Sequence, residues 1–307
     1  MSESGKKTSD PKIIYDYPSP VSKLLAVGDA REISGWPNYL ELGLTTEHVP
    51  DLVRMALDED LHWADGESDE VWGPLHAWRA LAQLRAEAAV EPLVELLSRV
   101  DEYDDDWTNE ELPEVFGHIG RASIEPVARF LADSEQGLWS RIAAASSFAE
   151  ISKRHSELRT ECVDALTRQL EQYSHQDPTL NGFIINYLTE LKAVESAPVM
   201  EQAFAADSVA ISIQGDWEDT QISLGLLQER LTPQPKYHPL LDNFLSPLIG
   251  ESPRPAQPQP ETPRRAAETK SKAKIRTKLE AARKTKAKTK AKRKQQKKAR
   301  KKQRKGK

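Results

Sequence analysis

The sequence predicts an all-helical protein in which one helical hairpin is written about four times between residues 75 and 207. Apolar residues in this stretch recur every three or four positions, the spacing of a helix with one buried face. A glutamate–proline pair at residues 91–92 recurs at 125–126, a spacing of 34, and Pro198 lies 72 residues after Pro126. Such a period is typical of an α-solenoid, because a single hairpin cannot bury its apolar stripe alone. The alternative is a non-repetitive helical bundle with coincidental proline pairs.

The four predicted hairpins follow one another closely, each with two apolar stripes. The stripes comprise Leu75, Trp78, Leu81 and Leu84, then Val90, Leu93, Val94, Leu96 and Leu97; Leu112, Val115, Phe116 and Ile119, then Ile124, Val127, Phe130 and Leu131; Ile142, Ala145, Phe148 and Ile151, then Cys162, Leu166 and Leu170; and Ile184, Tyr187, Leu188 and Leu191, then Val199 and Phe204. Pro92 falls in a first helical turn, where a missing amide donor costs nothing.

Two of these hairpins share a pattern of residues with a known repeat. The pattern is carried by Ala80, Leu81, Leu84, Val90, Glu91, Pro92, Leu93, Leu96 and Leu97, and is echoed by Phe116, Gly117, Ile119, Gly120, Ile124, Glu125, Pro126 and Val127. It resembles HEAT-like repeats, in particular those of the phycobilisome-lyase type found in a family of bacterial HEAT-repeat proteins. The resemblance covers about half of the chain and implies a fold, since one repeat serves many functions. It also leaves open an alternative function as a lyase-type or other enzyme-associated protein, in which the basic tail aids solubility or inhibits the protein.

Helix-capping residues mark where several of these helices begin. Thr108 and Glu111 fit a capping box, in which each side chain bonds the backbone amide of the other residue. Asp177 and Pro178 suit the N-cap and first position of the fourth hairpin.

Composition divides the chain into four segments. We expect a disordered N-terminal arm over residues 1–20 and a helical repeat domain over 21–231, with Trp217–Leu231 as its last structured part. Residues 232–263 contain nine prolines and predict an extended linker. Residues 264–307 form a Lys/Arg-rich tail.

Charge is divided unequally along the chain. The tail contains 23 Lys or Arg and only two acidic residues, so its net charge is +21, whereas residues 1–263 carry −26. A polycation of this kind attracts the phosphates of nucleic acid. The tail lacks aromatic residues for stacking on bases and a defined helix for reading them, so we expect non-specific contact with RNA, ribosomal RNA or DNA. The alternative is that the tail folds back on the acidic body. The predicted nucleic-acid-binding residues are Lys284, Lys286, Lys288, Lys290, Lys292, Arg293, Lys294, Lys297, Lys298, Arg300, Lys301, Lys302, Arg304 and Lys305.

Tryptophans next to acidic residues recur between the predicted hairpins. These candidates for a protein-binding groove are Trp63, Asp65, Trp72, Asp105, Asp106, Trp107, Trp139 and Trp217. Equivalent loops of a solenoid lie along one edge, and indoles flanked by carboxylates suit the Lys and Arg side chains of a protein partner. The alternative is structural: the acids cap helices and the indoles fill the junctions between repeats.

The sequence contains no recognised catalytic, nucleotide-binding or metal-binding motif, so we predict no enzymatic activity, cofactor or metal. Its single cysteine, Cys162, excludes an intrachain disulfide and is expected to be a buried thiol. No apolar run reaches the 18 or so residues of a membrane span, and the N-terminus has no apolar signal-peptide core. These features predict a cytoplasmic protein without membrane contact.

Overall fold

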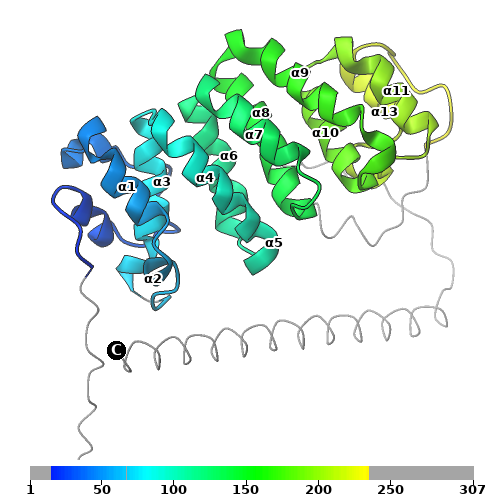
Figure 1. Cartoon of the computed structure of the whole chain (residues 1–307). Coiled ribbons are helices and arrows are strands. Elements are labelled where there is room, and N and C mark those ends of the chain that lie inside the picture. Colours follow the sequence, from blue (N-terminus) through cyan, green and yellow to red (C-terminus); the bar gives the residue numbers. More distant parts are fainter. Residues whose placement is uncertain (1–14, 67, 235–307) are drawn as a thin grey trace, which may run out of the picture. The chain divides into compact units, whose positions relative to one another are not determined.

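The computed structural model describes residues 15–66 and 68–234, and these residues contain helices and no strand (Figure 1). The predicted all-helical class is therefore confirmed for this part of the chain. The α-helices are α1 (Val49–Ala56), α2 (Glu59–His62), α3 (Gly73–Gln83), α4 (Val90–Glu95), α5 (Arg99–Tyr103), α6 (Asp106–Ile119), α7 (Ile124–Ala132), α8 (Leu138–Arg154), α9 (Arg159–Leu170), α10 (Pro178–Glu190), α11 (Ala197–Ala205), α12 (Ile211–Gln214) and α13 (Trp217–Leu224). Short 3-10 turns precede or join many of them.

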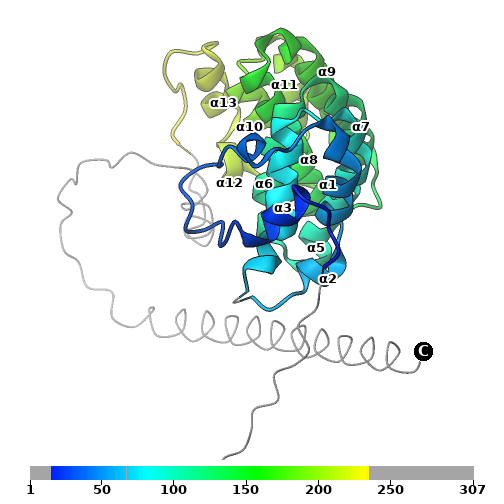
Figure 2. The ribbon, with the colours of Figure 1, turned by 90° about the vertical axis from the view of Figure 1, so that its left-hand side faces the viewer.

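Most of these helices fall into two rows (Figures 1 and 2). In the leading row, which holds the first helix of each hairpin, α3 contacts α6, α6 contacts α8, and α8 contacts α10. In the trailing row, α4 contacts α7, α7 contacts α9, and α9 contacts α11. The rows are joined because α8 also packs against α7 and α9. The helices of these two rows thus pack against helices of adjacent hairpins.

The contact between α6 and α8 is unusually close because it is made with small residues. A Cβ atom added to Gly117 of α6 would lie 3.0 Å from the backbone carbon and oxygen of Glu150 in α8. On α8, Ala143, Ala144 and Ala145 are buried. Helix backbones approach most closely where side chains are small, so this pair of helices has little room for anything larger than glycine at position 117.

Polar side chains tie each hairpin to the next. Asp101 of α5 accepts hydrogen bonds at 2.7 Å from both the backbone nitrogen and the hydroxyl of Ser140, so it caps the start of α8 from the helix that precedes the α6–α7 hairpin. Ion pairs in the trailing row join Glu91 to Arg129, Arg121 to Glu161, and Arg159 to Glu195. Their partners are 38, 40 and 36 residues apart, which is close to the spacing of the hairpins.

The N-terminal boundary differs from the predicted arm of residues 1–20. Tyr17 is buried in the core, and its hydroxyl donates a 2.7 Å hydrogen bond to Asp58 at the start of α2. The guanidinium of Arg54 lies 4.1 Å from the centre of the Tyr17 ring. An aromatic ring held by a carboxylate and a cation is fixed in place, so residues 15–20 belong to the helical body.

At the other end, the last helix is shorter than the predicted segment Trp217–Leu231. Helix α13 ends at Leu224, because Gly225 adopts a left-handed conformation with φ of 79° and stops it. Arg230 then folds back to pair with Asp216 and Asp219 at the start of α13. The linker beyond residue 234 and the whole Lys/Arg-rich tail lie outside the described residues.

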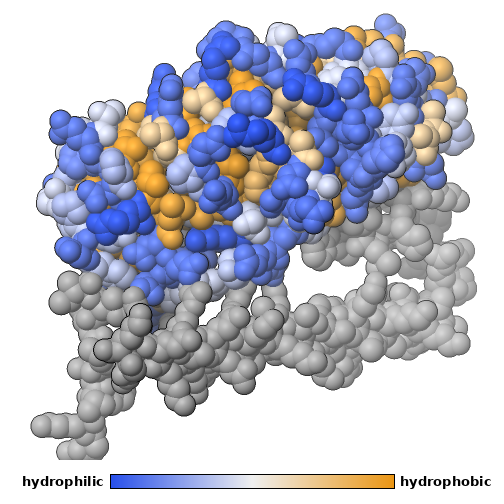
Figure 3. Space-filling model, viewed as in Figure 1, coloured by the Kyte–Doolittle hydropathy of each residue, from blue (hydrophilic) through white to orange (hydrophobic). Residues whose placement is uncertain are grey.

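Much of the face seen in Figure 3 is hydrophilic, and apolar side chains show between the polar ones in the region of α1 and α4. None of the helices in the described ranges has both the length and the apolar composition needed to cross a bilayer.

Cys162 is buried, as predicted. Burial, reinforced by the charge of Glu161, raises the pKa of its thiol to about 12, so the thiol stays protonated and unreactive at neutral pH.

The close contact at Gly117 gives a direct test of the packing. We expect Gly117→Val to lower the free energy of unfolding by about 1–3 kcal/mol, because the added methyl groups meet the backbone of Glu150. Urea unfolding followed by helical circular dichroism measures the loss. Gly66→Ala is the matched control, since nothing lies within 4 Å of the position of its added Cβ. Equal stability of the Gly117→Val protein and the wild type would show that α6 and α8 are not packed as described.

Candidate functional site

Two adjoining depressions lie on the polar side of the leading row, and both include Glu114 of α6. The first, of about 510 Å³, lies beside α3 and α6. The second, of about 260 Å³, lies between α6, α8 and α10 and is called here the acidic groove. The groove is lined by Asn109, Glu110, Pro113, Glu114, Ser146, Ala149, Glu150, Lys153, Arg154, Tyr187 and Glu190.

The first depression is bounded by residues 28–38, a segment without regular helix that we call the strap. Its attachment to α3 is polar. The Nε2 atom of His76 lies 2.8 Å from the carbonyl oxygen of Gly28, and Gln83 donates a 2.7 Å hydrogen bond to the carbonyl of Pro37. The side-chain oxygen of Gln83 accepts a 2.9 Å bond from the backbone of Tyr39 just beyond the strap. Two side chains of α3 therefore hold both ends of the strap.

Trp36 of the strap is enclosed between two helices. Its ring stacks on His118 of α6 with the ring centres 4.8 Å apart, and the guanidinium carbon of Arg79 lies 5.6 Å from its centre. Because His118 and Arg79 already occupy positions against this indole, Trp36 acts as a bridge between α3 and α6.

Below Trp36, Arg79 and Glu111 form a buried ion pair between α3 and α6. Burial lowers the pKa of Arg79, but the hydrogen bonds and charge of Glu111 outweigh burial, so its pKa lies above the ordinary value. This pairing corrects the capping box predicted for Thr108 and Glu111. Asp105 caps α6 instead, accepting hydrogen bonds from the backbone and the hydroxyl of Thr108. Glu111 is turned inward, where a carboxylate is stable only with a partner.

The acidic groove contains four carboxylates and two cations. Arg154 of α8 binds Glu150 of its own helix and Glu114 of α6, so part of the negative charge is neutralised while the two helices are joined. Lys153 lies 3.6 Å from Glu150. Glu110 and Glu190 supply the excess negative charge, from opposite sides of the groove.

The electrostatics of the groove reflect this excess. Partial burial, and then the charges of Asp106 and Glu111, raise the pKa of Glu110. Partial burial also raises the pKa of Glu190, with the charge of Glu150 acting in the same direction. Desolvation, followed by the charge of Glu190, raises the pKa of Tyr187, which therefore stays a neutral phenol. A cation arriving in this groove would relieve the repulsion between its carboxylates.

An aromatic ridge borders the groove along α8 and α10. Trp139 at the start of α8 is 44% exposed, and its ring meets the ring of Phe183 edge-on with the centres 6.1 Å apart. The ring of Phe183 lies 6.3 Å from that of Tyr187, which lines the groove. The ridge thus connects an exposed indole to a carboxylate-lined depression.

The tryptophans and acidic residues that the sequence analysis selected as candidates for a protein-binding groove lie in several separate parts of the structure. Trp72 and Trp107 meet edge-on with their ring centres 5.2 Å apart, and the guanidinium of Arg31 lies 5.1 Å from the centre of the Trp72 ring. Trp72 is buried and Trp107 half-buried, so this pair contributes to the junction of α6 with the turn before α3.

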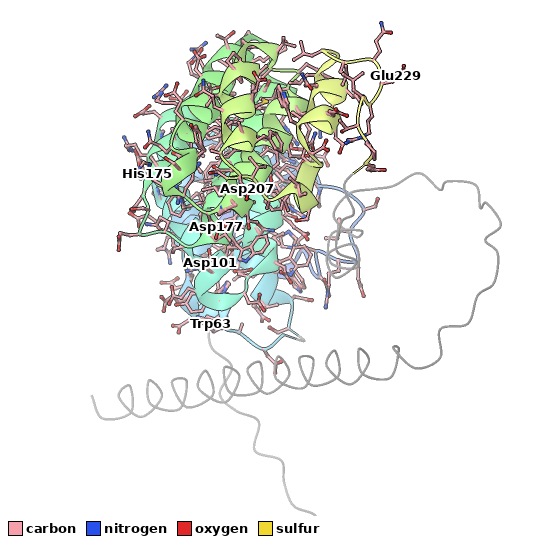
Figure 4. The ribbon with its side chains drawn as sticks, turned by 90° about the vertical axis from the view of Figure 1, so that its right-hand side faces the viewer. Trp63, Asp101, His175, Asp177, Asp207 and Glu229 are labelled. Atoms are coloured by element: carbon pink, nitrogen blue, oxygen red, sulfur yellow. The ribbon has the colours of Figure 1, made fainter. Side chains whose placement is uncertain are left out.

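Near this pair, Trp63 packs edge-on against Tyr103 with the ring centres 5.2 Å apart, and against His62 at 4.7 Å. The Nε2 atom of His62 lies 3.7 Å from Asp105, which links these residues to the cap of α6. In Figure 4, Trp63, Asp101, Asp177 and Asp207 follow one another along the view. Asp101 lies in α5, whereas Trp63, Asp177 and Asp207 flank the ends of helices.

The other predicted residues are dispersed. Asp65 and Asp106 are exposed, and Asp106 stands in the first turn of α6, where a negative charge favours the helix. Trp217 packs on Phe204 between α13 and α11. Trp139 is the member that reaches the acidic groove through the aromatic ridge. The predicted nucleic-acid-binding residues from Lys284 to Lys305 lie outside the described residues.

Sequence reasoning missed the acidic groove. The sequence pattern that could have revealed the groove is a set of glutamates on the polar faces of the leading helices. Glu110 and Glu114 are four residues apart on α6, and Glu150 and Glu190 lie near the ends of α8 and α10. Residues four apart share one helix face, so projecting each helix would have found the stripe. Glu111 lies between the first two and belongs to the buried face.

Comparisons of the chain with protein-family models, with curated proteins and with solved structures gave no match. The chemistry of the site therefore has to be taken from its own residues. In the described ranges no three His, Cys, Asp or Glu side chains gather in a way that could hold a metal ion. Carboxylates beside aromatic rings are suited to binding organic cations.

His76, which holds the strap, makes stability depend on pH. Burial lowers the pKa of His76 and outweighs the hydrogen bond to the carbonyl of Gly28, which acts in the opposite direction. The neutral ring donates from Nε2 to Gly28 and accepts at Nδ1 from the hydroxyl of Tyr39, 2.7 Å away. In the unfolded chain the imidazole of residue 76 binds a proton more readily than in the folded chain. The free energy of unfolding therefore falls as pH drops below about 6.5. We expect this fall between pH 7.5 and pH 5 to be smaller in His76→Gln than in the wild type, as measured by urea unfolding. His175→Gln, which changes an exposed histidine, is the control. Parallel curves for His76→Gln and the wild type would contradict a buried neutral imidazole.

Proposed function

We propose that this protein is a non-catalytic scaffold whose helical body binds a protein partner and whose basic tail binds nucleic acid without sequence preference. The observation that carries the proposal is the division of charge: +21 within residues 264–307 against −26 in the rest of the chain. A chain with one mildly acidic composition throughout would give no reason to assign separate roles to its parts. Here the two segments favour ligands of opposite charge.

We further propose that the body is a HEAT-like α-solenoid. Three features support this. Each row of helices makes its contacts between consecutive members, and the ion pairs of the trailing row recur with separations of 36 to 40 residues. Proline stands in the first turn of α4, α7 and α11 alike, as Pro92, Pro126 and Pro198. Solenoids commonly bind other proteins along a surface formed by equivalent helices, which here would be the polar side of the leading row.

The tail is assigned to nucleic acid because of its composition. Lysine and arginine bind phosphate groups and release the counterions condensed on them, so affinity falls steeply with salt. The tail offers no aromatic ring to stack on a base, which favours binding through the phosphate backbone of either RNA or DNA.

A gel-shift assay with duplex DNA and single-stranded RNA tests the tail. We expect the full chain to bind both, and a chain ending at Pro263 to lose most of this affinity. If about 8 phosphates are neutralised, the logarithm of the binding constant falls with the logarithm of salt concentration with a slope near −7 on duplex. Replacing Lys284, Lys286, Lys288 and Lys290 with glutamine should make this slope shallower by about 3 to 4.

Circular dichroism of the shortened chain serves as the control, because its helical signal must survive for the comparison to hold. Equal retention of RNA and DNA by the full and shortened chains would refute the role of the tail. A slope unchanged by the four substitutions would refute the counterion-release mechanism.

A further inference from the structure

The acidic groove presents an excess of negative charge on a face that no other described helix covers. Glu110 and Glu190 stand on α6 and α10, on either side of α8. Glu114 and Glu150 are held by Arg154, which fixes the floor of the groove. The unneutralised carboxylates are therefore carried by rigid, well-packed helices, which favours binding because little ordering is needed when a ligand arrives.

The backbone of α6 adds a hydrogen-bond acceptor to the same groove. Pro113 stands inside α6 and has no N–H group, so the carbonyl oxygen of Asn109, one turn earlier, lacks its usual helical donor. Both residues line the groove. Carboxylates together with a backbone carbonyl match the several N–H donors of a guanidinium or ammonium group.

The aromatic ridge supplies a third feature, independent of charge. Trp139 exposes 44% of its surface, and the ridge leads through Phe183 to Tyr187 in the groove. Exposed aromatic rings beside carboxylates attract lysine and arginine side chains through both their π faces and their apolar stems. Nucleic acid is disfavoured here, because its phosphates would meet the carboxylates of Glu110 and Glu190.

We propose that the acidic groove and the aromatic ridge form a docking surface for a Lys/Arg-rich segment of a partner protein. This inference deepens the scaffold role proposed above and rests on it. The segment runs across α6, α8 and α10, with basic side chains at Glu110 and Glu190 and a further one against Trp139. The charge of the groove and the exposed indole select for a basic, extended or helical peptide and reject acidic ones.

Fluorescence anisotropy with the full chain and a labelled 15-residue Lys/Arg-rich peptide tests this surface. We expect binding at about 50 mM salt that weakens as salt is raised. The double variant Glu110→Gln, Glu190→Gln should bind roughly fivefold more weakly, because two exposed ion pairs are lost. Trp139→Ala should also weaken binding several-fold, and Trp139→Phe should recover part of it because an aromatic face is restored.

The matched control is the double variant Glu95→Gln, Asp164→Asn. It removes the same net charge from exposed positions on α4 and α9 of the trailing row. We expect it to bind the peptide within twofold of the wild type. A peptide of equal length with glutamine in place of lysine and arginine should not bind.

Several outcomes would overturn the inference. Equal weakening by the two double variants would show that only the overall negative charge of the body matters. Binding that appears only after residues 264–307 are removed would assign the groove to the chain's own basic segment. Absence of peptide binding, with tail-dependent gel shifts intact, would refute the docking surface while leaving the nucleic-acid role standing.

Discussion

Gly117 of α6 lies against the backbone of Glu150 in α8, and the rest of the described structure depends on this close approach. Helix α8 can approach α6 because the facing residues are small, and it then serves both rows by packing against α7, α9 and α10 as well. The same approach brings Glu114 and Glu150 onto the single guanidinium of Arg154. A larger residue at position 117 would separate the helices and divide this ion-pair network, so packing and site geometry have one origin.

The polar side of the leading row is fixed by different interactions at its two ends. Toward α3, the strap, Trp36 and the buried pair of Arg79 and Glu111 line the first depression and join α3 to α6. Toward α10, the acidic groove and the aromatic ridge remain exposed. A buried ion pair contributes less to stability than to specifying one arrangement of the helices, because desolvation offsets much of its attraction. The result is a surface with a depression at each end, both lined by well-packed helices, as the proposed scaffold role requires.

Sequence reasoning predicted the helical class and the positions of most helices well, because apolar spacing and capping residues act locally. Asp177 caps α10 as predicted, and Cys162 is buried as predicted. It failed where a residue takes its role from a neighbour distant in sequence. Glu111 has the spacing of a capping residue but pairs with Arg79, 32 residues away. Tyr17, predicted to lie in a disordered arm, is held in the helical body by its hydrogen bond to Asp58. The candidate site was only partly predictable for the same reason: Trp139 was selected, but the carboxylates it adjoins become neighbours only when α6, α8 and α10 pack together.

The proposed solenoid requires the hairpins α3–α4, α6–α7, α8–α9 and α10–α11 to follow one another in a single row. Distances between spin labels in the trailing row test this order most directly. Cysteines for labelling replace the exposed Glu95, Glu125, Asp164 and Glu201, one each on α4, α7, α9 and α11, in a chain whose buried Cys162 is changed to alanine. Pulsed electron spin resonance then measures the separation of Glu95 from each of the other three positions. The account predicts distances that increase in the order Glu125, Asp164, Glu201. A distance from Glu95 to Glu201 equal to or shorter than that to Asp164 would mean that the helices surround one common core, and would contradict the account.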